Sequence, residues 1–182
     1  NNDKLTKLIH NLLNNNDYFD IFYKEFVDDF VKSKNYINDI EKLKEIKNDV
    51  SVAVESFYEE DPYPRWKKIT LNTNKVNFES TLINELTMSK FNPVQLAKYR
   101  TETVETLVAG CGTGRDALTF ALNINNTNVT AVDLSSTSLS YAIMKSEQYG
   151  ARNIHFMKGD LLDVDHLNKK FDYIISGGVL HH

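Results

Sequence analysis

A glycine-rich turn between two apolar segments constrains the fold of this chain more than any other feature. Residues 107–115 run from an apolar segment directly into three alternating glycines, Gly110, Gly112 and Gly114, and a second apolar segment ends at Asp133. Glycines allow a sharp turn and a close approach to backbone N–H groups, and the following helix directs its positive end toward the ligand. An acid about twenty residues further on can accept both hydroxyls of a ribose. The pattern predicts a nucleotide-cofactor site on a parallel α/β sheet.

The glycine spacing separates the candidate cofactors. The NAD fingerprint requires its third glycine at the position of Arg115, whereas the third glycine of this chain is Gly114, one residue earlier. The observed spacing fits an open loop around an uncharged sulfonium nucleoside better than a tight pyrophosphate cradle. An NAD site and a strand-to-helix turn without any ligand are the alternatives.

Residues 104–182 resemble the first half of a class I S-adenosylmethionine (SAM)-dependent methyltransferase. Residues 154–161 and 171–182 extend the resemblance, since they look like the third-strand and fourth-strand segments of that family. The resemblance implies an α/β fold with a Rossmann-like parallel sheet, whose first four strands have the order 3-2-1-4, and SAM as the cofactor. Val108 departs from the pattern, because many relatives carry an acid two residues before the first glycine.

The resemblance also assigns parts of the cofactor to individual residues. It implies contacts to the methionine part from Gly110, Cys111 and Gly112, to the ribose from Asp133, to the adenine from Asp160 and Leu161, and to the methionine and sulfonium from Ser176 and Gly177. The expected cofactor-binding set is completed by Thr113, Gly114, Arg115, Leu134, Tyr63 and Arg65.

Residues 57–66 contain two prolines that flank Tyr63 and force an extended, rigid path. The segment resembles the Tyr-x-Glu-Asn-Pro-Tyr-Pro-Arg-Trp stretch that precedes the SAM motif in a subgroup of bacterial methyltransferases, either linked to tetratricopeptide repeats or similar to protein-lysine methyltransferases, with Asp61 in place of the Asn. We expect it to fold over the methionine end of the pocket, with Arg65 on the carboxylate and Tyr63 or Trp66 excluding water. A stiff linker whose aromatic rings cover a core edge is the alternative.

Apolar residues at helical spacing predict a small helical region over residues 1–56, with its last stripe formed by Ile37, Ile40, Leu43, Val50 and Val54. We expect these helices to pack on the Rossmann-like part, on a segment outside this chain or on a second copy. Residues 57–103 form a connecting segment, and residues 104–182 form an incomplete SAM-binding domain.

The rhythm of the C-terminal part predicts alternating strands and helices. Strands are expected near residues 105–109, 129–132, 154–157 and 171–175, and helices near 114–123, 136–149 and 162–168. Gly150 stands where the C-terminal cap of the second helix belongs.

Composition excludes several classes of function. A net charge of −4 gives no overall basic field for nucleic acid, and no apolar run approaches the ~18 residues of a membrane span. The single cysteine, Cys111, cannot form an internal disulfide, so we expect a reducing, cytoplasmic setting. The resemblance to bacterial methyltransferases implies a bacterial source. No metal site is expected, because the histidines lack metal-ligand spacing; His181 and His182 could act as a general base but are better explained as the start of a helix.

The leading hypothesis is methyl transfer from SAM to an unidentified acceptor, either a protein lysine or a small molecule, by in-line attack that positioning and desolvation promote. We expect no nucleic-acid or membrane partner, and either a homodimer or a missing C-terminal half. A non-catalytic fragment that binds SAM or dimerises is the second hypothesis. An NAD-dependent oxidoreductase is the third.

Overall fold

The computed structural model describes residues 23–60, 62–86 and 101–179, together with Lys7, Asp20 and Tyr99. Its centre is a parallel five-stranded sheet of order β1-β4-β3-β2-β5. The strands are β1 (Glu41–Lys42), β2 (Val104–Ala109), β3 (Thr127–Asp133), β4 (Ile154–Lys158) and β5 (Tyr173–Ile175). The last four confirm the predicted Rossmann-like order, while β1 is an additional edge strand.

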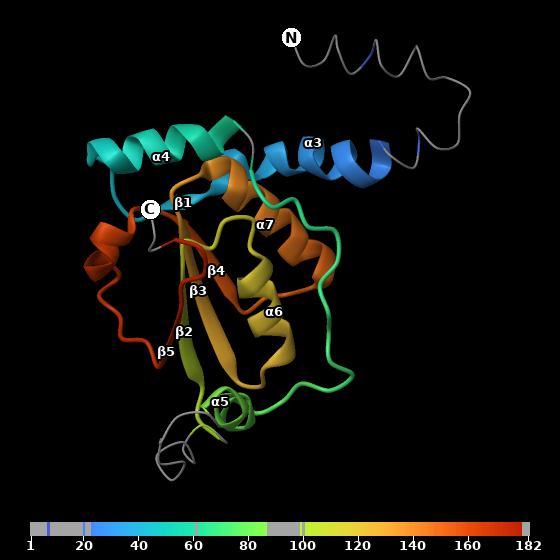
Figure 1. Ribbon diagram of the computed structural model, residues 1–182, viewed down its shortest axis with the longest axis vertical. Coiled ribbons are helices and arrows are strands. Elements are labelled where there is room, and N and C mark those ends of the chain that lie inside the picture. The colour runs from blue at the N-terminus through green and yellow to red at the C-terminus, as the bar shows by residue number, and fades with distance from the viewer. Residues whose placement is uncertain are drawn as a thin grey trace.

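Both faces of the sheet are apolar, as parallel strands require. Val104 and Val108 of β2 point to one face and belong to the larger core, whereas Leu107 and Ala109 point to the other face. Helices α6 (Arg115–Asn123) and α7 (Ser136–Tyr149) cover the first face, and the 3-10 helix η4 (Leu161–Leu167) lies over the second (Figure 1).

The ends of α7 follow from local residue types. The Ser135 hydroxyl accepts a hydrogen bond of 3.0 Å from the N–H of Ser138 and caps the first turn. Gly150 ends the helix in the left-handed conformation with φ of 68°, which confirms the predicted cap. Between these ends, Leu139, Tyr141 and Ala142 are fully buried. Through these residues, the buried side of α7 packs into the larger core.

The N-terminal region packs on the Rossmann-like part, which is the first of the three arrangements considered. A continuous helical segment comprises η1 (Lys24–Asp28), α3 (Asp29–Ser33) and η2 (Lys34–Asp39), and both α3 and η2 contact α7. Helix α4 (Asp49–Glu60) contacts α7 as well and continues across the expected boundary at residue 56. Helix α5 (Phe78–Leu86) lies at the opposite end of the strands from α4 (Figure 1).

One expectation for the N-terminal region is wrong. The apolar stripe that includes Ile40 and Leu43 does not form a helix, because the chain extends there and pairs with β4. The N–H of Leu43 donates a hydrogen bond of 2.8 Å to the carbonyl of Lys158, and Ile40 is buried in the larger core. Strand β4 otherwise ends the sheet on this side, and its unpaired backbone groups favour an extended partner over another helical turn.

A buried ion pair joins α3 to α7. Lys145 has only 3% of its side chain exposed, and its ammonium donates to the carboxylate of Asp29. Lys67 approaches the same carboxylate at 3.5 Å. Burial alone would raise the pKa of Asp29, but the hydrogen bond and the charge of Lys145 lower it below its ordinary value.

Candidate cofactor-binding site

The predicted glycine turn lies at the carboxyl end of β2 and is fastened to the neighbouring strand. The N–H groups of Gly110 and Cys111 both donate to the carbonyl of Val132 in β3, at 2.8 and 3.0 Å. Gly114 has φ of 81°, and a Cβ there would lie 2.5 Å from the Cβ of Ala142 in α7. A glycine is therefore required where α6 begins, because any side chain would separate α6 from α7.

Gly112 is the position at which a ligand could approach the turn most closely. A Cβ on this residue would meet no heavy atom nearer than the carbonyl oxygen of Tyr63, at 3.8 Å. Its N–H donates a hydrogen bond of 2.7 Å to Oδ2 of Asp133. The glycine turn and the acid at the end of β3 therefore meet directly, as the sequence predicts.

Asp133 is oriented by backbone donors on both carboxylate oxygens. Oδ1 accepts from the N–H of Ser135 at 2.9 Å, and Oδ2 accepts from Gly112. Burial raises the pKa of Asp133, and these N–H groups act in the opposite direction. A carboxylate has about four acceptor positions, so each oxygen keeps a lone pair for a ligand hydroxyl.

The next two strand ends carry the other predicted residues of the sheet edge. Asp160 is 6% exposed, and its Oδ1 accepts from the N–H of Leu162 at 2.9 Å, so that it caps η4. Leu161 follows in the first turn of η4 and is half-buried. Ser176 and Gly177 follow β5, and the Ser176 hydroxyl oxygen is buried without a hydrogen-bond partner among the described residues. An unpaired buried hydroxyl fits a site that a polar ligand completes.

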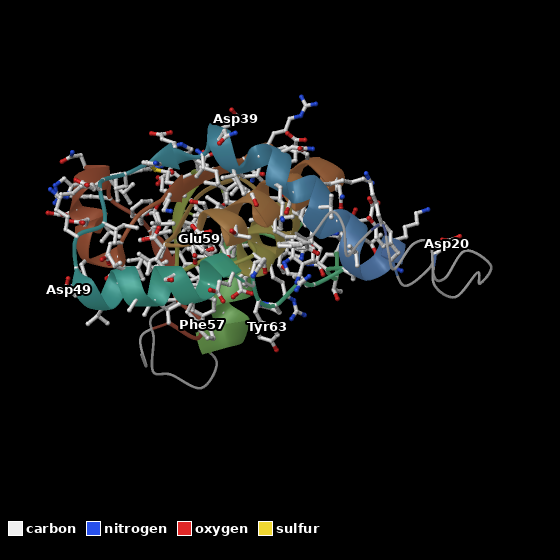
Figure 2. All side chains as sticks on the ribbon, turned by 90° about the horizontal axis from the view of Figure 1, so that it is seen from above. Asp20, Asp39, Asp49, Phe57, Glu59 and Tyr63 are labelled. Carbon is white, nitrogen blue, oxygen red and sulfur yellow. The ribbon has the colours of Figure 1, made fainter. Side chains whose placement is uncertain are left out.

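The proline-flanked segment packs against the glycine turn. The indole N–H of Trp66 donates a hydrogen bond of 2.9 Å to the carbonyl of Thr113, and the Thr113 hydroxyl donates one of 2.6 Å to the carbonyl of Pro64. Trp66 is 7% exposed, whereas Tyr63 is 74% exposed and projects outward (Figure 2). The guanidinium of Arg65 lies 4.8 Å from the ring centre of Phe30, so that it contacts the N-terminal helical segment.

The remaining positions predicted from the sequence lie beside these groups. Arg115 is exposed at the start of α6, and Leu134 is half-buried directly after Asp133. Cys111 is buried, and burial raises the pKa of its thiol well above the ordinary value, so it acts as a small apolar residue. His181, His182 and Asp61 lie outside the described residues. The specific contacts of the whole set with a cofactor stay a prediction.

The sequence did not point to Glu59, which joins α4 to the turn after β3. Its carboxylate accepts from the N–H groups of Ser136 and Thr137 at 2.7 and 2.9 Å, and from the Thr137 hydroxyl. Figure 2 shows Glu59 on the side of α4 that faces the strands and Phe57 on the opposite side. An acid at a helix N-terminus is favourable, but this acid comes from a different helix, so local capping rules could not identify it.

Lys158 at the end of β4 places a positive charge beside the carboxylates of Glu55 and Glu59. Its ammonium lies 2.6 Å from the carboxylate of Glu55 and 3.2 Å from that of Glu59, and donates to the Ser136 hydroxyl at 2.7 Å. Burial opposes the charge of Lys158, but the two carboxylates raise its pKa above the ordinary value. Helix α4 is therefore held against the turn that carries Asp133 by both backbone and charged contacts.

The sheet order and the strand-end geometry are those of a Rossmann-like α/β fold with a candidate cofactor site at its strand ends. Residues 107–182 match the family model described as a methyltransferase domain. The matched residues, which are less than half of the chain, are thus similar to a methyltransferase domain. No helix in the described part of the chain is long and apolar enough to cross a membrane.

Two curated relatives align with this part of the chain. An uncharacterized protein of Synechococcus is 40% identical over 77 residues, which cover 42% of this chain and 18% of that protein. Release factor glutamine methyltransferase of Bacillus subtilis is 38% identical over 87 residues, which cover 44% of this chain and 30% of that protein. The chain thus spans less than a third of the length of either relative.

A solved structure gives a broader but weaker likeness. Magnesium protoporphyrin IX methyltransferase of Synechocystis with bound S-adenosylhomocysteine is 22% identical, with a TM-score of 0.48. The alignment covers 72% of this chain and 60% of that chain.

Proposed function

We propose that this protein transfers a methyl group from SAM to an acceptor. The observation that supports this most directly is the contact between Gly112 and Asp133, which places an oriented carboxylate beside the open side of a glycine turn. SAM supplies an electrophilic methyl group, so the protein needs to bind, orient and exclude water rather than form a covalent bond.

The chain's own residues divide this work. The free lone pairs of Asp133 accept the two ribose hydroxyls, and the open side of Gly112 admits the ligand to within contact of the backbone. Trp66 fixes the outer side of the turn through the Thr113 carbonyl. The hydroxyl of Ser176 is available to a polar atom of the methionine end.

The acceptor in this proposal is a protein lysine or a small molecule. The net charge of −4 argues against nucleic acid, and a reducing, cytoplasmic setting suits the single buried Cys111. Mass spectrometry of proteins and metabolites after incubation with the purified chain and isotopically labelled SAM would identify the acceptor. SAM binding without any labelled product would instead favour a non-catalytic binding role.

The choice of cofactor provides the first test. The purified chain is expected to bind SAM and S-adenosylhomocysteine in titration calorimetry and to give no heat with NADH, because Gly114 precedes the position that a pyrophosphate cradle requires. Heat from NADH together with none from SAM would contradict the proposal and favour an oxidoreductase.

The ribose assignment provides the second test. Asp133→Ala leaves two ligand hydroxyls without a charged acceptor, so SAM binding is expected to weaken by about 1.5–3 kcal/mol, or about ten- to a hundredfold. Asp39→Ala removes an exposed acid of the N-terminal region and serves as the control for net charge. The melting temperature of each variant shows whether the fold is kept, and an unchanged Kd in folded Asp133→Ala would remove this residue from the site.

A further inference from the structure

The methionine end of SAM carries an ammonium group and a carboxylate, and a site that desolvates them must pair both. Val108, two residues before the first glycine, is an apolar residue with 2% exposure inside β2, so it supplies no charge to this end of the site. We propose that Asp116 supplies the missing negative charge and binds the ammonium group of SAM. This inference rests on the proposed function and names a residue outside the set predicted from the sequence.

The position of Asp116 brings its carboxylate to the end of β5. The residue lies in the first turn of α6, two positions after the last glycine of the turn. A Cβ placed on Gly177 would lie 3.4 Å from Oδ2 of Asp116, so the carboxylate faces the backbone that follows β5. The charge of Asp116 also contributes to the raised pKa of Cys111, after burial and Asp133, as expected for a carboxylate near the glycine turn. Asp116 therefore lies between the two loops that the methionine end would contact.

Four other acids at this edge of the sheet are already engaged. Asp133 accepts two backbone N–H groups, Asp160 caps η4, and both Glu55 and Glu59 contact Lys158. Asp116 is exposed, and within the described ranges its carboxylate has no hydrogen bond or ion pair. Its full acceptor capacity is free for a cation.

A second polar group near Asp116 also lacks a partner. Ser176 directly precedes Gly177, and its buried hydroxyl oxygen has no hydrogen-bond partner within residues 23–60, 62–86 and 101–179 or the three single described residues. An ammonium group has three donors, so it can satisfy the Asp116 carboxylate and the Ser176 oxygen together. Asp116 and Ser176 thus provide two unpaired acceptors on the segments that adjoin the glycine turn and the end of β5.

Titration calorimetry with two ligands tests this assignment. S-adenosylhomocysteine carries the ammonium group, whereas methylthioadenosine keeps the adenosine part but lacks the amino-acid end. Asp116→Asn is expected to weaken S-adenosylhomocysteine binding by about tenfold or more, since a charge-assisted hydrogen bond is lost, and to leave the Kd of methylthioadenosine unchanged. Asp39→Asn, which makes the same charge change at a remote exposed acid, is expected to leave both constants unchanged.

The outcomes separate this inference from the proposed function. An unchanged Kd for S-adenosylhomocysteine in Asp116→Asn overturns the inference while the binding of the parent protein still supports the function. Equal losses for both ligands also overturn it, because they indicate a disturbed loop rather than a lost ammonium contact. If the unaltered protein binds neither ligand, the proposed function fails and the inference fails with it.

Discussion

Asp29→Ala is expected to lower the free energy of unfolding by about 3 kcal/mol, because it leaves the ammonium of Lys145 buried without its carboxylate. Only 3% of the Lys145 side chain is exposed, and neither the remaining hydrogen bond to Gln148, at 3.1 Å, nor the rings of Trp66 and Tyr141 can neutralise the charge. Urea unfolding followed by circular dichroism measures the change.

The neighbouring acid provides a matched control. Asp28 also pairs with a lysine, but the side chain of Lys32 is 58% exposed, so Asp28→Ala is expected to cost less than about 1 kcal/mol. Adding Lys145→Met to Asp29→Ala should recover most of the lost stability, because the unpaired charge is then removed. Similar losses of unfolding free energy in Asp28→Ala and Asp29→Ala would show that the buried ion pair contributes no more to stability than the exposed one.

The second large effect is expected at Glu59. Burial alone would raise the pKa of its carboxyl, but hydrogen bonds from Thr137, Ser136 and Lys158 lower the pKa from 4.5 to about 2. A carboxyl whose pKa falls on folding stabilises the protein above its unfolded pKa, and this contribution is lost as the pH falls from about 4.5 toward 2. Glu59→Gln is expected to reduce stability at pH 7 by about 2–3 kcal/mol, after allowing for the water that reaches this carboxylate.

Urea unfolding at pH 7 and at pH 3 checks the Glu59 prediction. The difference in stability between the parent protein and Glu59→Gln should shrink at pH 3. At that pH the carboxyl of Glu59 is protonated in the unfolded state but still mostly ionised in the folded state, so folding must release a proton and part of the stabilisation is lost. Glu60→Gln, an exposed acid one residue further, is the control and should leave stability almost unchanged at both values. A pH-independent difference would mean that Glu59 acts through packing rather than through its charge.

The predictable part of this molecule is the part that depends on local pattern. The strand ending at Asp133 and the cap at Gly150 are encoded within a few residues, since strand alternation, glycine conformations and helix caps depend on near neighbours. The same local pattern placed Gly112 and Asp133 at adjoining strand ends, where they form a hydrogen bond.

The unpredicted part depends on contacts between distant residues. Glu41 pairs with Met157, more than a hundred positions away, and this pairing turns an apolar stripe into an edge strand. Glu59 caps a helix that begins at Ser136, and the residues next to Glu59 in the chain give no sign of that partner. Helical periodicity cannot report such pairings, because tertiary contacts can override local preference.

The chain contains a single tryptophan, and the fold places it where it can serve as an optical probe. The indole of Trp66 donates to Thr113 inside the glycine turn, while the Trp66 carbonyl accepts from the Tyr141 hydroxyl at 2.7 Å. Indole emission depends on the polarity and hydrogen bonding around the ring, and here both are supplied by the turn and by α7. Tryptophan fluorescence from the unmodified chain therefore originates beside the glycine turn, without background from any other indole.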